Sequence, residues 1–158
     1  SESRGLGDVY KRQKEYGFNR ISIGVQDFEK HVLDAINREP SKLPLEDIVG
    51  KIKMEGFTGT NIDLVYGLPL QTIESFDKTV DRAIKLGTDR IVTFSYAHVP
   101  SVIPRQKTLE KIGFPLPSEK AIMYQNAYDK LINAGYIAIG MDHFALPHDE
   151  LALSLIHI

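Results

Sequence analysis

The 158-residue sequence contains no cysteine. A disulfide framework is therefore excluded, and no residue can supply a thiolate to a metal ion or an iron–sulfur cluster. Apolar runs stay short of the roughly 18 residues that a membrane-spanning helix requires. The formal net charge is −2, without a basic block, which argues against nucleic acid or an anionic membrane as the main partner. We therefore expect a soluble protein that binds neither.

The two ends of the chain are related at the level of DNA. The segment DVYKRQ, residues 8–13, can be encoded GAT GTG TAT AAG AGA CAG. The reverse complement of this string translates as LSLIHI, which is the sequence of residues 153–158. Such a relation indicates a transposon-end sequencing adapter, so we exclude residues 1–13 and 153–158 from fold reasoning as non-native. Residues 14–152 have the length of one domain, or of a part of a larger one.

The apolar pattern of residues 14–152 predicts strands that alternate with helices. Four runs rich in Ile, Val or aromatic residues read as buried strands: Ile21–Val25, Ile62–Tyr66, Ile91–Tyr96 and Tyr136–Met141. Helical periodicity occurs over residues 45–52 and 73–84, and Thr72 and Ser118 stand where a side chain can cap a helix. Strands joined by helices must run parallel, so the fold class is α/β. Ligands of such folds gather at the carboxyl ends of the strands.

Polar residues at these strand ends are the first candidates for a binding site. Gln26 and Asp27 follow the first strand; the Gln26 amide suits a polar ligand, whereas Asp27 suits a turn. Asp63 lies within an apolar run, where a carboxylate must be protonated, paired or bound to a ligand. An ion pair that joins two strands explains Asp63 as well as a ligand contact does.

Three further sets of residues could serve binding. Arg38 carries a guanidinium that suits a carboxylate or ribose hydroxyls, although a solvated helix-end cation is the commoner explanation. Ala97 ends the third strand between two polar side chains, where its small size lets a ligand approach the backbone. Arg105 and Lys107 lie in the long 98–117 connection, where they could meet a substrate with several carboxylates. The acidic and histidine residues of 142–150 match no zinc spacing, so we expect loop hydrogen bonds there and no metal.

Five motifs occur in a fixed order: GVQDF, VLDAINRE, NIDLVYGLP, FSYAHVP and IGMDHFA. With them the chain resembles the oxygen-independent coproporphyrinogen III oxidases over nearly all of residues 16–152. The GVQ and NIDLVYGLP strings are shared with the wider radical S-adenosylmethionine (SAM) group. The AHVP and GMDHFA strings narrow the resemblance to these oxidases.

The resemblance implies a partial (β/α)6 TIM-like barrel, of which this chain supplies the C-terminal half. It also implies a cytoplasmic enzyme of porphyrin biosynthesis that receives electrons from a donor through a [4Fe-4S] cluster. In the family, reduction of S-adenosylmethionine yields a 5'-deoxyadenosyl radical that takes hydrogen from a propionate side chain before decarboxylation. Two such steps convert coproporphyrinogen III to protoporphyrinogen IX.

Carried over by position, the resemblance assigns S-adenosylmethionine contacts to Gln26, Arg38, Asp63 and Ala97. Asp63 would contact the ribose hydroxyls, and Ala97 would act through its backbone. The cluster cysteines of the family, in a Cys-x3-Cys-x2-Cys arrangement, are expected upstream of residue 14. We therefore expect this chain alone to be inactive, and marginally stable because its sheet edges are unpaired.

Two other hypotheses remain at this point. A haem chaperone of the same radical group shares the barrel and much of NIDLVYGLP, but its relatives usually carry a YEISN-like stretch in place of GMDHFA. If the relation between the two ends is chance, the chain could instead be a small independent α/β binding module.

Overall fold

The computed structural model describes residues 12, 17 and 19–156. Most of the two segments predicted to be adapter-derived, residues 1–11, 13 and 157–158, lies outside this range. The elements are β1 (Arg20–Gln26), α2 (Lys30–Ala35), α3 (Leu45–Met54), β2 (Gly59–Tyr66), α4 (Ile73–Leu86), β3 (Arg90–Ser95), the 3-10 helix η1 (Pro104–Lys111), α5 (Pro117–Asn133), β4 (Ile137–Ala138), β5 (His143–Ala145) and α6 (Glu150–Ile156). In these described residues, no helix is both long enough and apolar enough to cross a membrane.

The five strands form one sheet in the order β1-β2-β3-β5-β4. The first three strands are parallel, as predicted, while β5 is antiparallel to both β3 and β4. The predicted fourth strand over residues 136–141 is wrong in extent, because only Ile137–Ala138 joins the sheet. The chain reverses at Gly140, whose φ is 110°, and returns as β5 between β3 and β4. The sequence does not predict β5, because its three residues are too few for a periodic signal.

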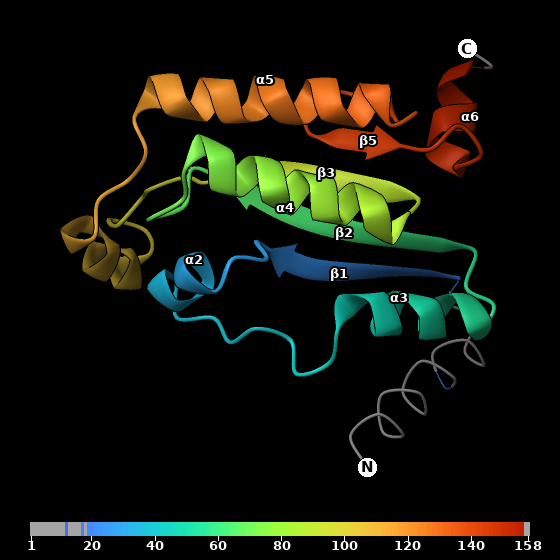
Figure 1. The fold of residues 1–158 in the computed structure, drawn as a ribbon, viewed down its shortest axis with the longest axis horizontal. Coiled ribbons are helices and arrows are strands. Elements are labelled where there is room, and N and C mark those ends of the chain that lie inside the picture. Colours follow the sequence, from blue (N-terminus) through green and yellow to red (C-terminus); the bar gives the residue numbers. More distant parts are fainter. Residues whose placement is uncertain (1–11, 13–16, 18, 157–158) are drawn as a thin grey trace.

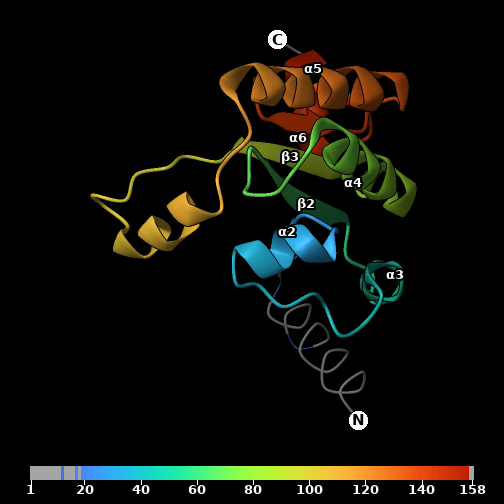
Figure 2. The ribbon, with the colours of Figure 1, turned by 60° about the vertical axis from the view of Figure 1, so that its left-hand side comes forward.

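Helices α3, α4 and α5 cover one face of the sheet (Figures 1 and 2). Alternation along β2 directs Ile62 and Leu64 into this helical layer, where both are fully buried. Asn61 and Asp63 point to the opposite face and are only partly buried. The core joins the three helices to the strands and includes Ile48, Ile52, Ile62, Leu64, Phe76, Val80, Ile91, Met123, Leu131 and Phe144.

The start of α4 confirms the predicted cap. Thr72 Oγ1 accepts a hydrogen bond from Ser75 N at 3.0 Å, and Ser75 Oγ accepts one from Thr72 N at 2.9 Å. The predicted cap at Ser118 is wrong, because α5 begins one residue earlier at Pro117. There the Glu119 carboxylate accepts from the backbone N of Leu116 at 2.9 Å, so the free amide at the helix start is satisfied without a serine.

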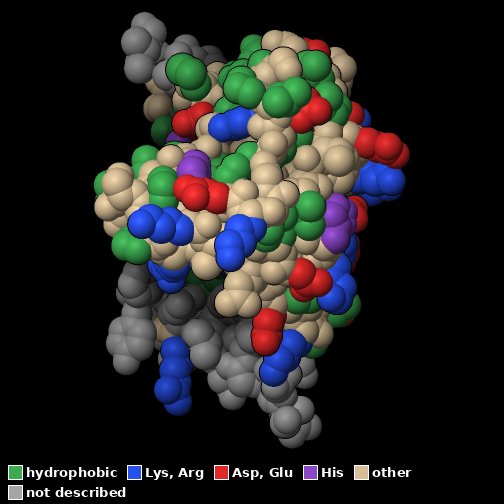
Figure 3. Space-filling model, turned by 90° about the vertical axis from the view of Figure 1, so that its left-hand side faces the viewer, with side chains coloured by type: hydrophobic (Ala, Val, Ile, Leu, Met, Phe, Trp, Pro, Cys, Tyr) green, Lys and Arg blue, Asp and Glu red, His purple; other side chains and the backbone are tan. Residues whose placement is uncertain are grey.

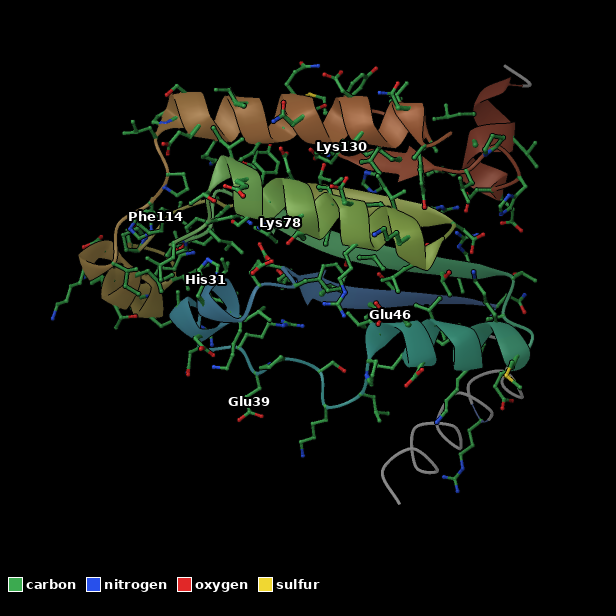
Figure 4. All side chains as sticks on the ribbon, viewed as in Figure 1. His31, Glu39, Glu46, Lys78, Phe114 and Lys130 are labelled. Atoms are coloured by element: carbon green, nitrogen blue, oxygen red, sulfur yellow. The ribbon has the colours of Figure 1, made fainter. Side chains whose placement is uncertain are left out.

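Ion pairs between helices supplement the core. Lys130 on α5 pairs with Asp81 on α4 at 2.9 Å, and Glu46 on α3 pairs with Arg82 on α4 at 3.2 Å. Figure 4 labels Lys130 and Glu46 on their helices. These pairs are partly exposed, and each adds less than about 1 kcal/mol to stability. Apolar burial therefore holds the helices on the sheet, and the ion pairs only help to fix their alignment.

Candidate functional site

The carboxyl ends of β1, β2 and β3 lie at one end of the molecule, next to α2 and η1 (Figure 1). Figure 3 views this end, on which cations, carboxylates and apolar side chains are interspersed. The predicted site residues at or after these strand ends come from three separate segments. Their placement decides whether they can share one ligand.

Gly24 is the point at which three of the four predicted residues meet. It lies opposite Asp63 in the register of β1 and β2. A Cβ atom at Gly24 would lie 3.4 Å from Gln26 Nε2 and 3.5 Å from an Arg38 guanidinium nitrogen. That guanidinium also donates a hydrogen bond to the Gly24 carbonyl. The structure therefore brings Gln26, Arg38 and Asp63 together around Gly24, which is only partly buried.

The motif that ends α2 turns the chain so that the Arg38 side chain points back to β1. Helix α2 stops at Ala35, and Asn37 adopts a left-handed conformation with φ 56°. The backbone N of Arg38 donates to Leu33 O at 2.9 Å, and that of Asn37 donates to Asp34 O at 3.0 Å. This pair of bonds is the Schellman arrangement, in which asparagine often supplies the left-handed residue. Arg38 is thus directed by a defined turn, and its guanidinium reaches back to Gly24.

Asp63 lies on the face of the sheet that the helices leave open. Its carboxylate accepts a hydrogen bond from Ser22 Oγ at 3.4 Å. The ion pair between strands that was the alternative for Asp63 does not form in the described part of the chain, where its partner is a hydroxyl. A partly exposed carboxylate without a cation partner remains free to accept hydrogen bonds from hydroxyl groups of a ligand.

Gln26 sits at an irregular end of β1. The pairing with β2 shifts register between Gly24 and Gln26, and Gln26 has a φ of 70°. A bulge of this kind re-aims a side chain, and bulges are common beside binding sites. Asp27, for which the sequence predicts a turn position, is almost completely buried. Nothing in the local sequence distinguished a buried Asp27 from an exposed one.

Ala97 lies at the same end of the sheet, two residues beyond β3. Its carbonyl accepts from Gln106 Nε2 at 3.0 Å, and Gln106 Oε1 accepts from the backbone N of Val99 at 2.7 Å. Gln106 therefore links Ala97 to η1 rather than to the residues around Gly24. Ala97 is exposed, and its backbone contact to a ligand stays a prediction.

The segment that carries η1 projects from the sheet (Figure 2). Phe114 stacks on Tyr96 with a centroid distance of 5.5 Å and contacts His98 at 4.7 Å. His98 Nε2 is 3.0 Å from a Glu110 carboxylate oxygen. These contacts order the segment, on which the predicted cations Arg105 and Lys107 are exposed.

A cavity of about 320 Å³ lies between β1, α2, the 39–44 segment and α3. Its lining includes Gly24 and Arg38 but neither Gln26 nor Asp63. Most of the other lining residues are aliphatic, aromatic or proline, and the lining cation Arg82 already pairs with Glu46 and stacks on Phe28. We therefore place the candidate site on the open face of the sheet and not in this cavity.

The opposite end of the sheet carries a buried ion network. Asp149 binds Arg20 at 2.6 Å and Arg90 at 2.7 Å, and its side chain is 0% exposed. Burial favours a raised pKa for Asp149, but hydrogen bonds from Arg90, Arg20 and the Leu151 amide outweigh it and lower the pKa. The predicted loop hydrogen bonds of residues 142–150 therefore include strong ion pairs. No cluster suited to a metal ion occurs among the described residues.

No protein-family model matches the chain, but individual proteins of known sequence and structure do. The chain is 41% identical over 148 residues to an oxygen-independent coproporphyrinogen III oxidase of Thermostichus vulcanus, which covers 94% of this chain and 46% of the relative. It is 44% identical over 147 residues to the enzyme of that name from Escherichia coli K12, covering 93% of this chain and 32% of the relative. The chain is homologous to one segment of these oxidases.

The solved structure "Coproporphyrinogen III oxidase (HemN) from Escherichia coli is a Radical SAM enzyme" superposes on the chain with a TM-score of 0.90. The two are 42% identical, and the match covers 96% of this chain and 35% of the other. The predicted resemblance and the predicted partial radical SAM fold are thereby confirmed. The names of the relatives favour an oxidase over a haem chaperone. The chain spans less than half the length of these curated relatives.

Proposed function

We propose that this chain forms the S-adenosylmethionine-binding segment of an oxygen-independent coproporphyrinogen III oxidase. The observation that carries the proposal is the meeting of Gln26, Arg38 and Asp63 around Gly24, at the carboxyl ends of parallel strands. The homology of the surrounding fold to the E. coli enzyme supports it. In the proposed enzyme, residues 14–152 belong to the barrel domain, and residues 1–13 and 153–158 do not.

The chemistry of the three side chains fits S-adenosylmethionine. The Asp63 carboxylate can accept hydrogen bonds from two ribose hydroxyls, and the Arg38 guanidinium can bind a carboxylate. Gln26 offers both a donor and an acceptor to a polar group. Gly24, which lacks a side chain, lets the ligand approach the strand backbone. The Ala97 backbone contributes from the connection that follows β3. When bound, the cofactor supplies the radical that starts the reaction.

An iron–sulfur cluster does not fit this chain. Its ligands are cysteine thiolates, and the sequence has none. In the proposed enzyme, the cluster and its electron donor therefore act through other parts of the protein. Arg105 and Lys107 on η1 are the proposed contacts to the propionates of the porphyrinogen substrate. Charge-removing substitutions of both that left substrate affinity unchanged would contradict this role.

A chimeric enzyme tests the proposal. Residues 19–152 of this chain replace the aligned segment of the E. coli oxidase, and the purified protein is assayed without oxygen for conversion of coproporphyrinogen III to protoporphyrinogen IX. We expect binding of S-adenosylmethionine and product formation. The Asp63→Asn chimera should bind the cofactor at least about tenfold more weakly, which is the loss expected when a charged hydrogen bond becomes a neutral one.

Asp34→Asn is the matched control, because Asp34 is an exposed acid on α2 whose ion pair in the described part of the chain is with its helix neighbour Lys30. This variant should behave like the unsubstituted chimera. A folded chimera with its cluster assembled that does not bind S-adenosylmethionine would refute the proposal. Haem binding without turnover would favour the chaperone instead.

A further inference from the structure

The backbone of Gln26 adopts a conformation that needs support. Its φ of 70° lies in the left-handed region, and the Asp27 N–H donates to Val25 O at 2.9 Å, which closes a three-residue turn around Gln26. A residue with a side chain rarely adopts this conformation, and it persists only where the surrounding structure holds it. The conformation directs the Gln26 amide toward Gly24 and Arg38.

Asp27, the residue after Gln26, is held in place by hydrogen bonds to its side chain. Its residue is 1% exposed, and both carboxylate oxygens are occupied by donors. Oδ1 accepts from the backbone N of Glu29 at 2.8 Å and from Thr79 Oγ1 at 2.7 Å. Oδ2 accepts from Gln71 Nε2 at 2.6 Å. A carboxylate only accepts hydrogen bonds, so it matches the three donors, which come from the N-cap residue of α2, from α4 and from the β2–α4 connection.

Gln71 links Asp27 to the backbone that follows β2. It is 4% exposed, and its Oε1 accepts from the backbone N of Gly67 at 2.7 Å and of Leu68 at 3.1 Å. Its Nε2 also donates to Val65 O at 3.0 Å. Asp27 and Gln71 together therefore fix the turn after β1 against the turn after β2, the strand that carries Asp63.

We propose that Asp27 is a positioning residue, which acts through Gln26 by holding the turn that presents the Gln26 amide to the ligand. The inference rests on the proposed function, because it requires that Gln26 contacts S-adenosylmethionine. In this proposal Asp27 itself does not touch the ligand, because the residue is 1% exposed and both of its carboxylate oxygens already accept hydrogen bonds from protein donors. Removing its charge therefore affects the ligand only through the turn.

The test is a double-mutant cycle in the chimeric enzyme. Asp27→Asn, Gln26→Ala and the double variant are titrated with S-adenosylhomocysteine, a non-cleavable probe, by calorimetry without oxygen. An asparagine side chain has only one acceptor oxygen, so its NH2 group must face at least one of the donors that now bind the Asp27 carboxylate. The turn around Gln26 therefore loses a hydrogen bond that supports it. With Gln26 present, we expect Asp27→Asn to weaken binding about tenfold. In the Gln26→Ala background, the same change should alter binding less than about twofold, because the affected contact is already gone.

Two further variants separate positioning from general destabilisation. Tyr136→Phe removes a buried hydrogen bond of 2.6 Å to Thr88 O, near the amino end of β3, and should lower thermal stability without changing affinity. Thr79→Val removes only one of the three donors to Asp27 and serves if Asp27→Asn does not fold. It should weaken binding about threefold, and this loss should also disappear in the Gln26→Ala background.

The outcomes distinguish this inference from the proposed function. Equal losses in both Gln26 backgrounds, or unchanged affinity after Asp27→Asn, overturn the positioning role while the proposed function stands. An unsubstituted chimera that folds and does not bind the probe overturns the proposed function, and the positioning role with it.

Discussion

Replacement of Asp149 by alanine should destabilise this chain more than any exposed charge removal. Asp149 binds Arg20 from β1 and Arg90 from β3, and its Oδ1 also accepts from the backbone N of Leu151 at 2.9 Å. One buried carboxylate thus joins two strands to the start of α6. Without it, the guanidiniums of Arg20 and Arg90, whose side chains are 25% and 17% exposed, lose the carboxylate that both of them bind.

The expected loss is about 3 to 5 kcal/mol, the range for breaking a buried ion pair by removing one partner. Because both guanidiniums keep some contact with water, we expect the lower end of this range. Even about 3 kcal/mol is a large share of the 5 to 15 kcal/mol that stabilises a typical domain.

Urea denaturation followed by circular dichroism measures the effect as a shift of the unfolding midpoint. Asp34→Ala is the control, because its ion pair with Lys30 is exposed and adds only about 0.3 to 0.5 kcal/mol. If Asp149→Ala and Asp34→Ala shift the midpoint equally, the buried network does not stabilise the chain and this reasoning is wrong.

The same variant has a characteristic pH dependence. Although burial acts to raise the pKa of Asp149, the arginines and the Leu151 amide lower it below its ordinary value. Above about pH 4, the carboxylate is charged in both the folded and unfolded chain, and its full contribution is present. As the pH falls below about 4, the unfolded chain binds the proton first, so stability is lost toward the folded-state pKa. The difference in unfolding free energy between wild type and Asp149→Ala should therefore shrink on acidification, and a constant difference would contradict the ionic origin.

Three further predictions concern the core, a tyrosine and the site. Ile62→Ala should cost about 2 to 5 kcal/mol in denaturation experiments, because Ile62 is fully buried between sheet and helices; a loss below about 1 kcal/mol would mean that the site repacks. Burial raises the pKa of Tyr136 to about 12, so Tyr136→Phe should remove the most alkaline phase of an ultraviolet titration, and a titration that keeps this phase assigns it to another tyrosine. Gly24→Ala should leave stability nearly unchanged, since the added methyl would lie 3.4 Å from Gln26 and 3.5 Å from Arg38. It should nevertheless weaken S-adenosylhomocysteine binding to the chimera about tenfold by filling the space at the strand, and unchanged affinity would place the ligand elsewhere.

The candidate site was only partly predictable from the sequence. Gln26 was identified by its position at a strand end, Asp63 as a carboxylate within an apolar run, and Arg38 as a guanidinium after a helical segment. The motif resemblance supported all three, and the structure places them together around Gly24. The importance of Gly24 was not predicted, because it depends on the register of β1 against β2. Ala97 lies at the same end of the sheet, but its hydrogen-bond partner Gln106 follows from the path of the long connection.

The sequence by itself determined the α/β class, the three parallel strands, the helices between them and the family resemblance. These features follow from local periodicity, from helix-capping residues such as Thr72 and from motifs within short segments. The tertiary structure decided which distant residues meet: Asp27 with Thr79, 52 positions later, and Arg20 with Asp149, 129 positions later. The position of β5 between β3 and β4 was likewise decided by the tertiary structure. Such contacts depend on strand order, register and burial, which the whole chain sets together and no local pattern encodes.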